Sequence, residues 1–118
     1  MDQYENREDP RYAGSFKIKV SLLDTNASWE TYVEDVSITG LRVKFDYPIN
    51  NLRVGSEILL QVDRAVMDSY INFSGKIVHW YSNSIFTICG IRITEINPEG
   101  NYKWGKIVEL MRSKKNQS

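Results

Sequence analysis

The sequence predicts a mainly β fold, a six-stranded antiparallel β-barrel followed by one C-terminal α-helix. In six short segments apolar residues alternate with polar ones, which is the period of a strand with one buried face. Turn-forming residues separate these segments at short intervals, as in small all-β domains. Near the C-terminus the apolar spacing changes to that of a helix. The residues that share this helical face are Trp104, Ile107, Val108 and Met111.

The strands follow one another with little chain between them. They are expected over residues 16–22, 29–36, 41–45 and 58–62, then from residue 71 up to a turn at 82–84, and over 85–96. Gly75 occupies an inward position of the fifth strand, and the inward phase of the sixth strand slips near Gly90. Both positions therefore indicate bulges or bends, which small barrels need at their corners.

The two ends of the chain differ from the barrel segment. Residues 1–15 are polar, lack apolar periodicity and are expected to form a mobile N-terminal arm. Asn97 is a favourable N-cap and Pro98 suits the first helical position, so the helix is expected to begin there. We expect residues 16–112 to form the barrel and helix, and residues 113–118 to fray.

Composition excludes several classes of function. The chain has 118 residues, enough for one domain, and its 15 basic and 15 acidic residues give a net charge of zero. Binding of duplex nucleic acid or of an anionic membrane through a basic excess is therefore not expected. The polar N-terminus is not a signal peptide, and no apolar run could cross a bilayer, so we expect a cytoplasmic protein without membrane insertion.

Catalytic and metal chemistry are not expected either. The chain has one cysteine and one histidine, Cys89 and His79, and no spacing of acidic residues around them that suggests a metal site. Cys89 lies in the apolar run 85–93, where it is expected to be a buried thiol. No phosphate-binding glycine loop and no nucleophile–base pair are present. The sequence therefore predicts neither an enzyme nor a cofactor.

Two short motifs carry groups suited to binding a ligand. The first places Arg7 and Arg11 four residues apart in the N-terminal arm. The second is the segment Asp35–Gly40 between two strands, with an acid, a hydroxyl and a glycine at Asp35, Ser37 and Gly40. Alone, the arginines could form only ion pairs with neighbouring acids, and Asp35 and Ser37 could simply stabilise a turn. The combination of both motifs favours a binding site.

These groups match what a guanine dinucleotide offers. An arginine fork can bond the O6 and N7 acceptors of guanine and can stack on its ring, while a carboxylate accepts hydrogen bonds from the N1 and N2 donors. Hydroxyl, amide and guanidinium donors suit the phosphates. Pro10 disfavours a helical arm, and an extended arm would place the Arg7 and Arg11 Cα atoms about 13 Å apart. That span could reach both ends of a compact dinucleotide.

With these motifs the sequence resembles the PilZ domain family over about residues 7–112. The segments at Pro48, 55–58, 75–78 and 90–93 also look like the later strands of that family. The resemblance implies a bacterial protein whose fold is a six-stranded barrel with a C-terminal helix. It also implies that this domain binds the second messenger cyclic di-GMP. It implies that Arg7 and Arg11 clamp guanine and phosphate, and that Asp35, Ser37 and Gly40 complete the site.

Three further residues have two readings each. Arg42 and Lys44 point away from the apolar face of their strand and either line the ligand site or belong to the solvated face. Trp80 either stacks on a base or packs as a strand aromatic.

For function we expect a cyclic di-GMP receptor whose arm is ordered by the ligand, which changes the surface seen by a downstream protein partner. The alternatives are a PilZ-fold protein-interaction module that no longer depends on cyclic di-GMP, and a barrel that binds single-stranded nucleic acid. The zero net charge counts against the second alternative.

Overall fold

A computed structural model describes residues 10–13, 16–62 and 71–116. Of residues 115 and 116 it describes the backbone alone. It contains one short strand, six longer strands and a helix in these ranges. In chain order they are β1 (Tyr12–Ala13), β2 (Lys17–Leu22), β3 (Ser28–Ser37), β4 (Gly40–Phe45), β5 (Glu57–Val62), β6 (Ile71–Ser82), β7 (Thr87–Glu95) and α1 (Pro98–Asn116).

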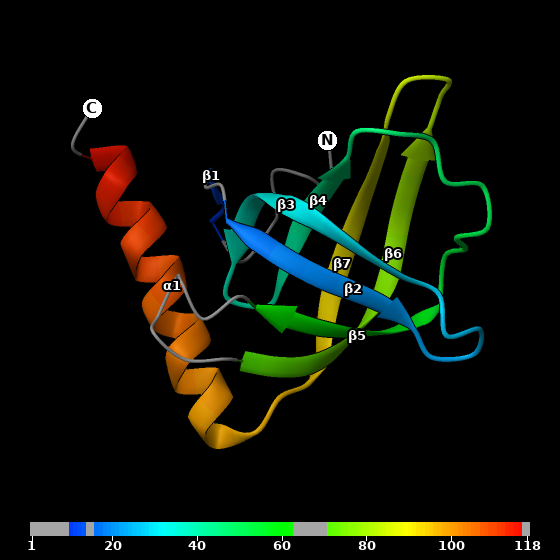
Figure 1. Ribbon diagram of the computed structural model, residues 1–118. Helices are drawn as coiled ribbons and strands as arrows, with labels where there is room; N and C mark the ends of the chain where they lie inside the picture. The colour runs from blue at the N-terminus through cyan, green and yellow to red at the C-terminus, as the bar shows by residue number, and fades with distance from the viewer. Residues whose placement is uncertain (1–9, 14–15, 63–70, 117–118) are drawn as a thin grey trace, which may run out of the picture.

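The six longer strands close into an antiparallel barrel. Along the sheet the strand order is β1-β3-β2-β5-β6-β7-β4, and β4 pairs with β3 to close the ring (Figure 1). Every pairing is antiparallel. The predicted six-stranded barrel with a C-terminal helix is therefore confirmed. The structure adds β1, which pairs with the same edge of β3 as β2 does.

The inward side chains of the strands fill the barrel. β2 shows the pattern: Ile18, Val20 and Leu22 are buried, whereas Lys17 and Lys19 between them are exposed. This alternation is the period-two pattern of the sequence, and it recurs in β5. The barrel core is therefore continuous and apolar.

Helix α1 packs against β1, β3 and β6 on one side of the barrel (Figure 1). It buries the predicted face, with Trp104, Ile107 and Met111 at most 2% exposed. The Asn97 side-chain oxygen accepts a hydrogen bond of 2.6 Å from the Gly100 amide, so Asn97 caps the helix as predicted. No helix within the described ranges combines the length and apolar character that a membrane crossing requires.

Most strand boundaries differ from the sequence predictions by a residue or two, and the two ends of the chain differ by more. β1 lies inside the expected arm, and most of the remaining arm, residues 1–9 and 14–15, is outside the described residues. β6 ends at Ser82, at the start of the expected turn, and β7 begins two residues later than expected. α1 continues to Asn116 into the segment that was expected to fray. The expected bulges are present: the β6–β7 register shifts beside Gly75 and opposite Gly90.

Candidate functional site

The segment 37–40 forms a tight hairpin turn between β3 and β4. Ser37 pairs with Gly40 across the turn, and the Ser37 hydroxyl donates a hydrogen bond of 3.4 Å to the Gly40 carbonyl. The Trp104 indole N–H donates to the Ser37 carbonyl at 2.9 Å, which ties the turn to α1. A Cβ atom at Gly40 would lie 2.3 Å from the Ile91 carbonyl oxygen, so only glycine allows β7 to approach this closely.

A β-bulge in β3 sets the direction of the acidic side chains. Val33 pairs with Val43 and Asp35 pairs with Arg42, so Glu34 is an extra residue on β3. Such a bulge reverses the alternation of the strand beyond it. It therefore changes which face receives the residues that follow.

The reversal is visible in the burial of β3. Val33 lies in the core, and so does Val36 three residues later, whereas unbroken alternation would place Asp35 there. Because of the bulge, Glu34 and Asp35 both reach Arg42 on the outer face of the sheet. Two neighbouring carboxylates thus share one face of the barrel.

Strand β1 brings the N-terminal arm to this face. Tyr12 pairs with Val36 and Ala13 pairs with Asp35, which places Arg11 beside the end of β3. The Arg11 Nη1 atom lies 2.9 Å from Asp35 Oδ1. Residues 24 positions apart in the sequence therefore meet in one ion pair, and this ion pair joins the two predicted motifs.

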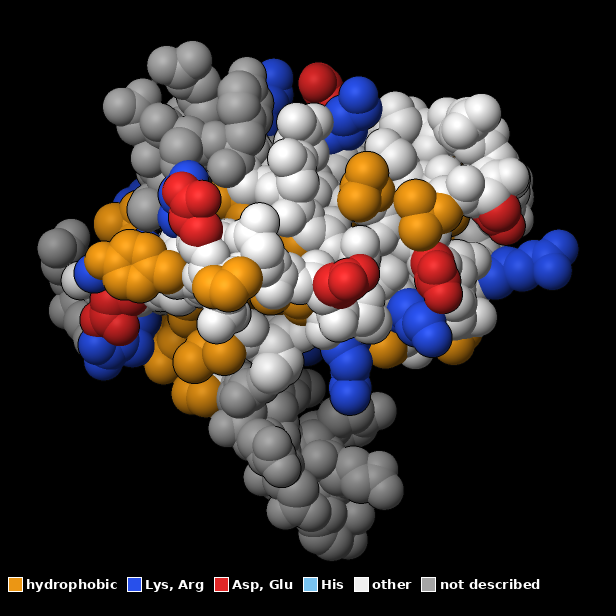
Figure 2. All heavy atoms as spheres, turned by 90° about the horizontal axis from the view of Figure 1, so that it is seen from below, with side chains coloured by type: hydrophobic (Ala, Val, Ile, Leu, Met, Phe, Trp, Pro, Cys, Tyr) orange, Lys and Arg blue, Asp and Glu red, His pale blue; other side chains and the backbone are white. Residues whose placement is uncertain are grey.

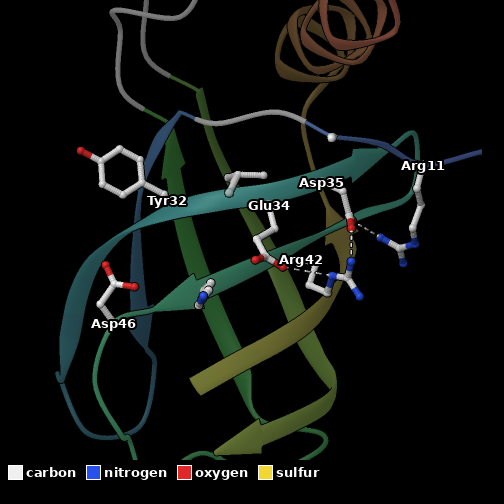
Figure 3. A pocket seen from close by; sticks show the side chains of 9 residues that line it. Arg11, Tyr32, Glu34, Asp35, Arg42 and Asp46 are labelled. Atoms are coloured by element: carbon white, nitrogen blue, oxygen red, sulfur yellow. Dashed lines mark hydrogen bonds and ion pairs between the residues drawn. The ribbon is translucent and has the colours of Figure 1, made fainter. Parts of the chain in front are cut away.

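Asp35 also pairs with a second arginine. The Arg42 Nη2 atom lies 2.7 Å from Asp35 Oδ2, and Arg42 Nε lies 3.6 Å from Glu34 Oε1. The side chains of Arg11 and Arg42 are 28% and 44% exposed, and that of Asp35 is 10% exposed. Figure 3 shows the Asp35 carboxylate between the two guanidinium groups.

A hollow of about 680 Å³ opens on this face, a volume typical of small-molecule sites. We call it the β3–β4 hollow. Its lining is polar at both ends, with Tyr32 and Asp46 at the end away from Arg11 (Figure 3). Three cations and three acids line it, so charges of both signs are available to a ligand. The lining residues are Arg11, Ala13, Tyr32, Val33, Glu34, Asp35, Arg42, Lys44 and Asp46.

The structure brings together only part of the predicted site. Arg11 and Asp35 line the hollow, and so does Arg42, the predicted secondary contact. Ser37 and Gly40 are buried in the adjoining turn and do not line it. Arg7 lies outside the described residues.

Two other residues had an undecided role in the sequence. Trp80 is partly buried against the core and does not line the hollow, so its role as a ligand contact stays a prediction. Lys44 lines the hollow, and its ammonium group lies 4.9 Å from the centre of the Phe86 ring.

Sequence reasoning missed three polar lining residues, Tyr32, Glu34 and Asp46. A signal for Glu34 was present. The apolar residues Val33 and Val36 are three apart, which breaks the period of two and indicates an extra residue between them. Tyr32 and Asp46 follow from strand pairing, which the sequence pattern does not give.

The described residues bear on metal ligation and on thiol reactivity in two ways. They contain no group of three or more histidine, cysteine or acidic side chains that could hold a metal ion. Burial raises the pKa of the Cys89 thiol from 9.0 to about 12, so the thiol stays protonated and unreactive at neutral pH.

Comparison with known proteins agrees with this geometry. The family model for the PilZ domain matches residues 5–110. The chain belongs to the PilZ domain family. No curated protein sequence matches the chain. The family match covers both motifs as well as the barrel, and it confirms the resemblance found in the sequence.

Solved structures show that the fold is the one these domains share. "PilZ domain with c-di-GMP of YcgR from Escherichia coli" has a TM-score of 0.77 at 11% identity, covering 94% of this chain and 95% of that one. The inhibitor of motility MotI/DgrA from Bacillus subtilis has a TM-score of 0.74 at 10% identity, covering 95% and 52%. The K. pneumonia MrkH–c-di-GMP complex has a TM-score of 0.73 at 13% identity, covering 95% and 55%.

Proposed function

We propose that this PilZ domain is a receptor for cyclic di-GMP and binds it in the β3–β4 hollow without catalysing a reaction. The observation that carries the proposal is the meeting of Arg11 from the first motif with Asp35 from the second at 2.9 Å. Solved relatives of the same fold hold this ligand, as in the PilZ domain of YcgR and in MrkH. Both of these observations support one nucleotide site on the outer face of β3 and β4.

The chemistry of the hollow suits guanine and phosphate. The Asp35 carboxylate accepts from the N1 and N2 donors of guanine, which adenine does not offer in the same pattern. Arg11 supplies a fork for the O6 and N7 edge or for a phosphate, and it can stack on a base. Arg7, four residues earlier in the chain, supplies a second fork. Ser37 and Gly40 hold the turn that fixes the end of β3.

Signalling would follow from the position of the arm. Arg11 directly precedes β1, and β1 packs against α1. In our proposal the ligand draws Arg7 and Arg11 over the hollow and changes the surface that a downstream protein partner meets. The ligand is a messenger and not a cofactor, since no bond is made or broken.

Isothermal titration calorimetry with cyclic di-GMP tests the receptor proposal. We expect saturable binding, and binding of cyclic di-AMP at least about fivefold weaker because a good bidentate base contact contributes about 1–3 kcal/mol. Arg11→Ala should weaken cyclic di-GMP binding by a similar factor. Lys76→Ala is the matched control, since it removes a cation from the exposed face of β6 away from the hollow.

Two results would contradict the proposal. One is an absence of heat and of any change in melting temperature at millimolar cyclic di-GMP. The other is equal binding by the wild-type protein and by Arg11→Ala. The first would favour a protein-interaction module that keeps the fold and does not depend on the nucleotide, and the second would remove Arg11 from the binding site.

A further inference from the structure

We propose that Arg42 competes with the ligand for Asp35, and that Glu34 receives Arg42 when the ligand takes its place. In this scheme Arg42 lowers the affinity for the nucleotide, and Glu34 reduces that penalty. The inference rests on the proposed function, because it describes how the same hollow exchanges an internal ion pair for a guanine base.

The occupancy of Asp35 is the first step of the argument. One carboxylate oxygen accepts a hydrogen bond from Arg11 at 2.9 Å, and the other forms an ion pair with Arg42 at 2.7 Å. A guanine edge needs both oxygens, because it presents two neighbouring donors in one plane. The Asp35 side chain is only 10% exposed, and its carboxylate lies between the two guanidinium groups (Figure 3). A base that takes both oxygens therefore displaces both arginines from the carboxylate, and in the proposed complex Arg11 then binds the base or a phosphate.

Arg42 has a second carboxylate within reach of its guanidinium group. Its Nε atom already lies 3.6 Å from Glu34 Oε1, and its side chain is 44% exposed. The β3 bulge places Glu34 on the same face as Asp35, next to it in the sequence. Arg42 can therefore leave Asp35 and keep a carboxylate partner without moving its backbone. Arg11 differs from Arg42 in this respect: among the described residues, Asp35 is the one carboxylate within 4.0 Å of its guanidinium group.

This exchange predicts effects opposite to those of bulk charge. The ligand carries two phosphates, so loss of a nearby cation would ordinarily weaken its binding and loss of a nearby acid would strengthen it. If Arg42 blocks Asp35, removal of the cation strengthens binding. If Glu34 holds the displaced Arg42, removal of the acid weakens binding. The signs of the two effects therefore separate the exchange from simple electrostatics.

The test is a titration of four proteins with cyclic di-GMP: wild type, Arg42→Gln, Glu34→Gln and the double variant. We expect Arg42→Gln to bind about three- to fivefold more tightly and Glu34→Gln about threefold more weakly, as for half-exposed ion pairs. In the Arg42→Gln background the Glu34 substitution should have no effect. Lys76→Gln and Glu57→Gln, which remove a facing pair on β5 and β6, are the charge-matched controls.

The outcomes distinguish this inference from the receptor proposal. Wild-type binding together with weaker binding by Arg42→Gln would overturn the exchange and make Arg42 a direct ligand contact, leaving the receptor proposal intact. A lack of binding by all four proteins would overturn the receptor proposal and the exchange with it.

A measurement without ligand adds an independent check. The melting-temperature shifts of Asp35→Asn and Arg42→Gln should be non-additive by about 2–5 °C, because the two side chains form one pair. Additive shifts would overturn the exchange whatever the ligand does.

Discussion

At the scale of single residues, the environment of a side chain decides what it can do. In the sequence Asp35 looks like an acid that stabilises a turn, yet in the structure its carboxylate pairs with Arg11, just before β1, and with Arg42 on β4. Cys89 shows the opposite case. A cysteine thiol can act as a nucleophile, but Cys89 is 2% exposed in the apolar core and its raised pKa keeps the thiol neutral.

The raised pKa of Cys89 makes stability depend on pH in the alkaline range. Between pH 9.0 and about 12 the thiol ionises in the unfolded chain and stays protonated in the folded one. The folded state then binds more protons, so stability falls as pH rises, by at most about 1.4 kcal/mol per pH unit. Below pH 9 this contribution is constant.

Urea unfolding of wild type and Cys89→Ala between pH 8 and 11 measures this effect. The variant should be less stable at pH 8 by a fixed amount, because it leaves a small cavity. The two free energies of unfolding should converge as pH rises. Parallel curves would contradict the burial-raised pKa.

At the scale of elements, local departures from regular structure build the site. The β3 bulge turns Asp35 out of the core, and β1 places Arg11 against it. The close approach of β4 and β7 at Gly40 and the bond from Trp104 fix the turn between β3 and β4. α1 is therefore connected directly to the turn that follows Asp35.

Trp104→Phe should destabilise the domain by about 1–3 kcal/mol. The phenylalanine keeps an aromatic ring beside Phe16 and Phe73 but leaves the buried Ser37 carbonyl without its 2.9 Å hydrogen bond. Chemical denaturation measures the change, with Trp29→Phe on the partly exposed Trp29 as the comparison. A Trp104→Phe cost below about 0.5 kcal/mol, or equal to that of Trp29→Phe, would show that the bond adds little.

At the scale of the whole molecule, the sequence predicted the architecture better than the site. Alternation and the helical period identified six strands and one helix, because both depend only on which residues are buried. The strand order could not be predicted, since alternation does not show which strands pair. The hollow depends on that pairing, so Tyr32 and Asp46 could not be placed in it.

The charge distribution also belongs to this scale. On the face shown in Figure 2, acidic and basic side chains are interspersed and form no single-sign stripe. This fits the net charge of zero and a small ligand held by a few specific groups better than a long polyanion. In our proposal, recognition depends on the geometry around Asp35.

A crystal structure of the chain grown with excess cyclic di-GMP tests the central claim most directly. We expect the nucleotide in the β3–β4 hollow, with a guanine edge on the Asp35 carboxylate, Arg7 and Arg11 on base or phosphate, and Arg42 turned to Glu34. An empty hollow, or ligand elsewhere with Asp35 still paired to both Arg11 and Arg42, would contradict the account.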